Sequence, residues 1–139
     1  MRILIACDKF KGSLSAQEAC EALRDGLASA DPSSDLIVCP VADGGEGFAE
    51  AMVLARGGRW DCCESLDALG NPVNVRYGMV SNEEGGDEAV IEMAEASGLY
   101  RILGLSPDVL RSSSFGTGSL IRSAVEQGAQ RILLGIGGS

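Results

Sequence analysis

Two short apolar runs frame a helical pattern in the first part of the chain. Residues 2–6 (Arg-Ile-Leu-Ile-Ala) and 36–41 have the length and composition of buried strands in a parallel sheet. Between them, apolar residues recur at helical spacing, and Ser15 with Glu18 fits a capping box at the start of that helix. A second helical pattern runs through Leu54. The order strand, helix, strand, helix predicts a doubly wound α/β fold with a parallel sheet and right-handed crossovers.

The hydrophobic pattern changes after Arg59 and becomes that of a mixed sheet. The pattern predicts extended segments at 60–65 and 73–80, followed by an acidic loop at 82–87 and a third strand at 89–93. A helix is predicted at 118–128 and a final buried strand at 131–136. The strand at 89–93 is expected to pair with the strand at 73–80 as a hairpin. We therefore expect a domain boundary after residue 72, with a second, mixed α/β domain that begins in residues 73–139.

Charge and composition exclude several classes of protein. The 139 residues carry a formal net charge of −9, and the eleven basic residues form no cationic run, which argues against nucleic acid or an anionic membrane as a partner. No stretch approaches the roughly 18 apolar residues of a membrane span. The N-terminus lacks the charged and apolar regions of a signal peptide, so the expected location is the cytoplasm. The negative net charge does not exclude a small anionic substrate, because a few lysines that lie close together could bind it.

The cysteine and histidine content narrows the available chemistry. The five cysteines have neither an even count nor a Cys-x-x-Cys spacing and are expected to be reduced core thiols: Cys7, Cys20, Cys39, Cys62 and Cys63. The chain has no histidine, which excludes Ser-His-Asp and Cys-His mechanisms and leaves no usual zinc set. Any proton transfer must use a carboxylate, a lysine or water.

The first candidate loop follows the first strand, where ligands gather at the carboxyl edge of an open α/β sheet. Lys9 and Lys11 supply positive charge, Gly12 permits close backbone approach, and a helix beginning near Ser13 or two residues later would offer free N–H groups to an anion. Asp8 would orient a lysine, bind a metal or accept a proton. The structural alternative is that the lysines are simply solvated and the serine only caps the helix.

The second candidate loop is Asp43-Gly44-Gly45-Glu46-Gly47, expected at the corresponding end of the second strand and again before a helix. Asp43 could hold Mg²⁺ or act as a base, and Glu46 is an alternative metal ligand. Either carboxylate could instead only stabilise the helix N-terminus. Two such loops at the same edge of one sheet favour a functional interpretation.

Two further segments contain glycine and hydroxyl groups. Backbone amides and hydroxyls there could wrap a phosphate or a carboxylate, in loops formed by Gly116, Thr117 and Gly118 and by Gly137, Gly138 and Ser139. Loop flexibility and helix capping are the structural alternative. The residues alone therefore leave three hypotheses open: a phosphate-handling enzyme, a flavodoxin-like nucleotide- or flavin-binding module, and a purely structural α/β fragment.

The order of these loops resembles the type-1 glycerate kinases. The matching segments span nearly the whole chain and lie at residues 8–16, 40–47, 91–94, 96–99, 116–118 and 135–139. The resemblance implies ATP-dependent phosphorylation of D-glycerate, most often to 2-phosphoglycerate. It also implies a two-domain α/β enzyme with its active site in the cleft between the domains. Residues 1–72 would form the N-terminal part of a flavodoxin- or Rossmann-like domain with a parallel sheet, and residues 73–139 the incomplete beginning of a second, mixed α/β domain.

The resemblance further implies roles for individual residues. Asp8 and Lys11 match the family site, as does the acidic glycine loop that begins at Asp43. We expect Lys11 to neutralise the transferring phosphoryl group or the glycerate carboxylate, and Mg²⁺ to bridge the ATP phosphates. Asp8 or Asp43 would orient or deprotonate the substrate hydroxyl. The remaining positions expected to bind substrate or phosphate are Lys9, Gly12, Ser13, Gly44, Gly45, Glu46, Gly116, Thr117, Gly118, Gly137, Gly138 and Ser139.

The chain departs from the family in two respects. Cys7 stands where many members have proline, which places a thiol near the expected site. Members are also much longer, so the chain is expected to be a fragment whose isolated activity is open. A fragment would leave sheet edges and an apolar face uncovered, and self-association through those surfaces is expected.

Overall fold

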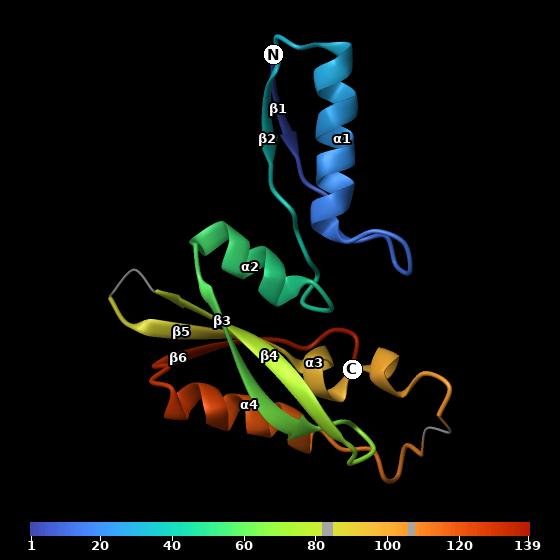
Figure 1. The fold of residues 1–139 in the computed structure, drawn as a ribbon, viewed down its shortest axis with the longest axis vertical. Helices are drawn as coiled ribbons and strands as arrows, with labels where there is room; N and C mark the ends of the chain where they lie inside the picture. The colour runs from blue at the N-terminus through green and yellow to red at the C-terminus, as the bar shows by residue number, and fades with distance from the viewer. Residues whose placement is uncertain (82–84, 106–107) are drawn as a thin grey trace. The chain divides into compact units, whose positions relative to one another are not determined.

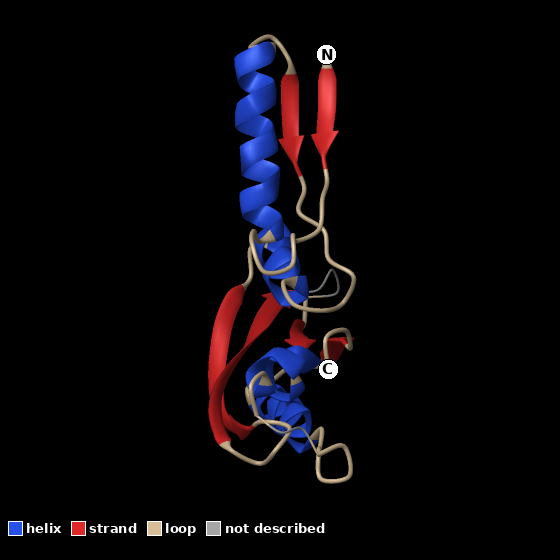
Figure 2. Ribbon diagram, turned by 90° about the vertical axis from the view of Figure 1, so that its right-hand side faces the viewer, coloured by secondary structure: helices blue, strands red, loops and turns tan. Residues whose placement is uncertain are grey.

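The computed structural model describes residues 1–81, 85–105 and 108–139, so the acidic loop expected at 82–87 lies partly outside the described residues. The chain forms two compact units, Met1–Asp43 and Gly44–Ser139. Both combine helices and strands, which confirms the α/β class (Figures 1 and 2). Within the described ranges, no helix is long and apolar enough to cross a membrane.

The first unit is a strand–helix–strand motif. Strand β1 (Arg2–Ile5) and strand β2 (Asp35–Val38) pair in parallel, and helix α1 (Ala16–Ala30) connects them (Figure 1). This arrangement confirms the predicted parallel pair and its crossover helix. The capping box is also confirmed, because the Ser15 hydroxyl accepts the Glu18 N–H at 3.2 Å and the Glu18 carboxylate accepts the Ser15 N–H at 2.8 Å.

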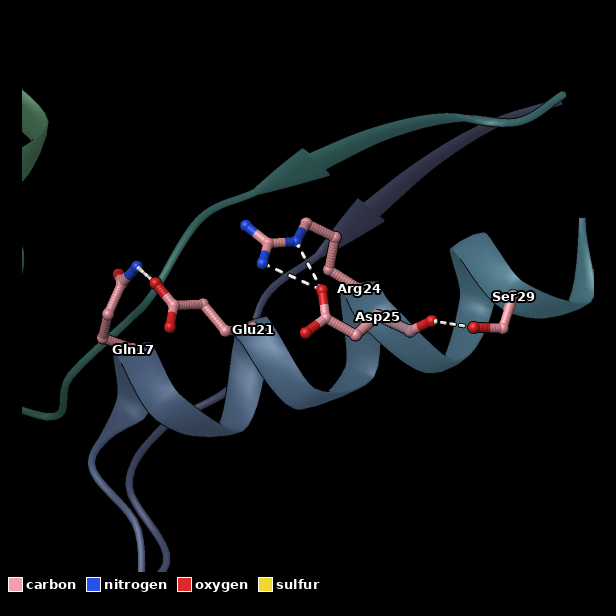
Figure 3. A network of polar contacts seen from close by, with 5 residues as sticks. All are labelled: Gln17, Glu21, Arg24, Asp25 and Ser29. Carbon is pink, nitrogen blue, oxygen red and sulfur yellow. Dashed lines mark hydrogen bonds and ion pairs between the residues drawn. The ribbon is translucent and has the colours of Figure 1, made fainter. Parts of the chain in front are cut away.

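Helix α1 has one apolar and one polar side. Ala16, Ala19 and Cys20 are its buried residues. Polar side chains along the helix bond to one another and to the helix backbone, as Figure 3 shows for Gln17, Glu21, Arg24, Asp25 and Ser29. Small residues on the buried side let α1 pack closely against the two strands, while the polar side keeps its hydrogen bonds local.

The second unit is built on a four-stranded mixed sheet in the order β3-β4-β5-β6. The elements of this unit are α2 (Phe48–Arg56), β3 (Arg59–Leu66), β4 (Pro72–Ser81), β5 (Asp87–Glu92), α3 (Met93–Ser97), the 3₁₀ helix η1 (Leu99–Ile102), α4 (Phe115–Glu126) and β6 (Arg131–Gly135). The first three strands are antiparallel, and β6 joins β5 in parallel. The predicted hairpin of β4 with β5 is therefore confirmed.

Helices α2 and α4 pack against opposite faces of this sheet (Figure 1). The alternation along β4 explains why, since Tyr77 and Met79 belong to the core that contains α4, whereas Val80 belongs to the core that contains α2. Gly78 allows α2 to approach closely, because a Cβ at that position would lie 2.2 Å from a methyl carbon of Val53. Both faces of β4 are therefore buried over residues 77–80, whereas Asn74 and Arg76, earlier in the strand, are exposed.

The compact units divide the chain between Asp43 and Gly44, whereas the sequence predicts a domain boundary after residue 72. Strands β3 and β4, on either side of that predicted boundary, lie in one sheet, because they pair from Arg59 with Met79 to Leu66 with Pro72. The assignment of domains within a longer protein stays a prediction. The expected loop at 116–118 is wrong, since these residues lie in the first turn of α4.

Candidate functional site

The first unit brings together three of the predicted site residues. The Lys9 ammonium lies 3.7 Å from the Asp8 carboxylate and 3.6 Å from the Asp43 carboxylate. The side chain of Lys9 is only 15% exposed, whereas that of Asp43 is 66% exposed. Lys9 is therefore a shielded cation that links two carboxylates, and Asp43 presents the more accessible of the two.

The parallel strands explain why residues so far apart in the sequence meet. Beyond the ends of β1 and β2, the Cys39 N–H donates to the Ile5 carbonyl at 2.8 Å and the Val41 N–H donates to the Cys7 carbonyl at 3.2 Å. These bonds keep the two segments side by side up to the positions just before Asp8 and Asp43. The expectation that the two candidate loops share one sheet edge is confirmed for this pair of carboxylates.

The basic loop between Lys9 and α1 folds into a tight turn. Phe10 and Leu14 exchange backbone hydrogen bonds of 2.9 and 3.1 Å, and Gly12 at the tip has a φ of 76°, which favours glycine. Lys11, Gly12 and Ser13 are exposed at this tip. The Ser13 N–H donates to the Phe10 carbonyl at 2.9 Å, so it is not a free helix N–H group. The loop thus offers an accessible lysine to a ligand.

In the second unit, two glycine segments that were predicted separately lie against each other. The Gly137 N–H donates to the Gly44 carbonyl at 2.9 Å. A Cβ at Gly137 would lie 2.7 Å from the Gly45 nitrogen, and a Cβ at Gly138 would lie 3.6 Å from the Glu46 carboxylate. At Gly137 the two backbones meet at a distance that a side chain would prevent, so glycine is required there for close approach, whereas Gly138 has room for a Cβ but a φ of 73° that favours glycine.

Glu92 stabilises the helix that follows this loop. Helix α2 begins after Gly47, which has no side chain to cap it, and the Ala49 N–H instead donates to the Glu92 carboxylate at 2.7 Å. Glu92 is only 6% exposed, and this burial raises its pKa above the ordinary value, opposed by the bond from Ala49 and reinforced by the charge of Glu95. The N-terminus of α2 is thus already occupied by a carboxylate.

Residues 116–118 contribute to packing. The Thr117 hydroxyl bonds to the Ser97 hydroxyl at 2.9 Å in a buried position, and the Ser65 hydroxyl donates to the Gly116 carbonyl at 3.0 Å. A Cβ at Gly116 would lie 1.9 Å from the Leu66 carbonyl oxygen. Gly116 therefore allows α4 to contact β3, and a ligand-binding role for these residues stays a prediction.

Metal binding has limited support in the geometry. Among residues 1–81, 85–105 and 108–139, no three or more carboxylates or thiols are arranged to hold a metal ion. Mg²⁺ that travels with nucleotide phosphates usually takes only one or two protein carboxylates. Asp43 and Glu46 have exposed side chains, so either carboxylate could serve as a single protein ligand of such a Mg²⁺ ion.

Sequence reasoning did not identify two features of this site. It expected Asp8 to orient a lysine as one of three alternatives, but it did not expect Lys9 to lie between Asp8 and Asp43; the assignment of Lys9 to phosphate binding stays a prediction. It also assigned no role to Glu92, and the signal that could have drawn attention to this residue is an acidic side chain that ends the apolar run of β5. The Ala49 partner is 43 residues away in the sequence, so no local pattern reveals the pair.

Comparison with known proteins gives a consistent result. A model of the glycerate kinase family matches residues 3–139. Proteins named glycerate kinase from Bacillus subtilis (strain 168) and glycerate 2-kinase from Escherichia coli (strain K12) are 45% and 43% identical over 139 residues, which is all of this chain. The chain spans only 36% of the length of each of these relatives.

A solved structure also resembles the chain. The crystal structure described as glycerate kinase 2 from Salmonella typhimurium LT2 superposes with a TM-score of 0.81 at 45% sequence identity. The match covers 100% of this chain and 36% of that one. The likeness therefore extends over both compact units.

Proposed function

The chain belongs to the glycerate kinase family, and on that premise we propose that it contributes to cytoplasmic, ATP-dependent phosphorylation of D-glycerate. The expected product is 2-phosphoglycerate, in keeping with the name of the Escherichia coli relative. The observation that carries the proposal is the placement of the Lys9 ammonium between Asp8 and Asp43, beside a loop that exposes Lys11.

The first unit supplies the groups that phosphoryl transfer requires. Asp8 or Asp43 orients the substrate hydroxyl and accepts its proton, and Lys9 holds the two carboxylates in position. Lys11, on the exposed turn, neutralises oxygens of the transferring phosphoryl group or the glycerate carboxylate. Positioning and charge neutralisation carry most of the catalysis, because phosphoryl transfer needs little covalent assistance.

The second unit supplies a glycine-rich surface. The contact between Gly44-Gly45 and Gly137-Gly138 brings backbone groups together where a substrate or phosphate would bind, with Ser139 as a nearby hydroxyl. Mg²⁺ bound to ATP would neutralise phosphate charge, with Asp43 or Glu46 as its protein ligand.

A chimeric enzyme tests this proposal while supplying the part of the relatives that this chain does not cover. Residues 1–139 replace the matching segment of the Bacillus subtilis glycerate kinase, and ADP release is measured with Mg-ATP in the presence and absence of D-glycerate. Glycerate-dependent release is expected. A folded chimera without such release contradicts the proposal.

Paired variants of the chimera test the role of Lys11. Lys11→Ala should reduce the glycerate-dependent rate by about 100-fold or more, as expected for a group that stabilises transition-state charge. Arg24→Ala is the matched control, because Arg24 is a cation on the polar side of α1 that pairs with its neighbour Asp25, and its rate should stay near that of the parent. A Lys11→Ala rate within a few-fold of the parent would remove Lys11 from the mechanism.

A further inference from the structure

Two cysteines in the first unit lie in direct contact. Cys7 follows β1, Cys20 lies on α1, and their sulfur atoms are 3.2 Å apart. A disulfide bond has a length of about 2.05 Å, so the sulfurs need to approach by only roughly 1 Å. Cys7 is partly exposed, whereas Cys20 is completely buried.

We propose that Cys7 and Cys20 form a reversible disulfide and that this pair is an oxidative modification site beside Asp8 and Lys9. With a peroxide as oxidant, the Cys7 thiol reacts first, giving a sulfenic acid and one molecule of water. The Cys20 thiol then attacks the sulfenic sulfur, forming the S–S bond and releasing a second water. A small-molecule thiol restores both cysteines by exchange.

The exposure of the thiols determines this order. Cys7 is the accessible member of the pair, whereas Cys20 is completely buried in contact with it, so the oxidant is expected to react with Cys7 first. Of the other three cysteines, Cys39 and Cys62 are exposed and Cys63 is partly buried. The contact with Cys20, burial and the charge of Asp8 raise the pKa of Cys7, which makes the first step slow at neutral pH.

Oxidation would affect the candidate site through the backbone. Cys7 is bonded directly to Asp8, and the Cys7 carbonyl accepts the Val41 N–H two residues before Asp43. Moving the Cys7 sulfur toward α1 therefore disturbs the carboxylates on both sides of Lys9. The proposal does not depend on the kinase assignment, because it concerns the thiols and the loop that carries them.

Peptide mapping of the 139-residue chain tests the disulfide directly. The chain is exposed to hydrogen peroxide at mildly alkaline pH, free thiols are alkylated, and trypsin then cleaves after Arg2, Lys9 or Lys11, and Arg24. The expected product joins the peptide carrying Cys7 to the peptide Gly12–Arg24, two hydrogen atoms lighter than their sum. Dithiothreitol should separate the two peptides.

Two variants make the outcome decisive. The triple variant, which combines Cys39→Ser, Cys62→Ser and Cys63→Ser, should still form the disulfide between Cys7 and Cys20. The variant Cys20→Ala should instead leave Cys7 as a sulfenic acid or a higher oxide. The proposal would be refuted if, in the triple variant, Cys7 and Cys20 were both alkylated or were oxidised separately without a bond between them.

A spectroscopic measurement tests the link to the site. In the triple variant, oxidation should shift the amide resonances of Asp8, Lys9 and Asp43, and reduction should reverse the shift. A disulfide that forms while these resonances stay unchanged would refute the coupling to the site.

Discussion

The Glu92 carboxylate offers a sharp test of how the glycine loop is held in place. Replacing Glu92 by Leu removes the acceptor of the Ala49 N–H, whereas Glu92→Gln keeps an oxygen that can accept it. Ala49 is 1% exposed, so water does not readily replace the lost partner. An unsatisfied buried donor costs about 1–3 kcal/mol. Glu92→Leu should therefore be less stable than Glu92→Gln by about that amount.

The pH dependence of the same residue has a definite sign. Burial raises the pKa of Glu92 in the folded chain, so the folded state binds this proton more tightly than the unfolded state. Its stabilising contribution is complete below the pKa of an unfolded glutamate, about 4.3, and is lost as the pH rises through the raised folded pKa. Glu92→Gln lacks this loss. Its stability relative to the parent should rise across that window by up to about 1.4 kcal/mol per pH unit.

Urea unfolding monitored by tryptophan fluorescence is the appropriate assay. Trp60 is the only tryptophan of the chain, and it packs against the core formed by α2, β4 and β5. Its signal therefore reports the unit that contains Glu92. Parent, Glu92→Gln and Glu92→Leu are compared at several pH values between 4 and 8, with the free energy of unfolding taken from each midpoint and slope.

Two results would refute this reasoning. Equal stability of the Gln and Leu variants would show that the bond from Ala49 is energetically unimportant. A difference between the parent and Glu92→Gln that stays constant with pH, or changes in the opposite direction, would show that burial does not control the pKa of Glu92.

Further predictions concern packing and capping. Gly116→Ala should destabilise the second unit by about 3 kcal/mol because the new Cβ would overlap the Leu66 carbonyl. Gly118→Ala, with open space around its Cβ, should stabilise it by about 0.5–1 kcal/mol. Urea unfolding followed by Trp60 fluorescence compares the pair, and equal midpoints would contradict the close contact. Ser15→Ala should cost the first unit about 1 kcal/mol by removing its capping box, measured as a lower thermal midpoint in circular dichroism, whereas Ser15→Asp should keep most of the stability.

Local signals allowed much of the fold to be predicted. The strands β1 and β2 are short apolar runs, and α1 begins where Ser15 and Glu18 form their capping box, all within a few residues of sequence. The start of α4 was predicted at residue 118, three residues too late, because Gly116 and the residues around it are typical of a loop. Packing outweighs that preference, since the missing side chain of Gly116 lets the helix approach β3.

The candidate site was predictable only as far as strand topology determines it. Parallel strands place their carboxyl ends at one edge, which was enough to expect Asp8 and Asp43 near each other. The position of the Lys9 ammonium between them depends on side-chain conformation, which a one-dimensional pattern does not specify. The bond between Glu92 and Ala49 depends on how two distant segments pack.

The bond between Gly137 and Gly44 has a consequence for the order in which the chain folds. On the ribosome, β3, β4 and β5 can pair as each emerges, because they are joined by antiparallel connections. The Gly44 carbonyl cannot accept its hydrogen bond until Gly137 has been synthesised, and Gly137 follows the parallel strand β6. A nascent chain stalled before that residue would carry an unfinished glycine loop, so late closure of β6 on β5, rather than hairpin formation, should set the time at which this loop matures.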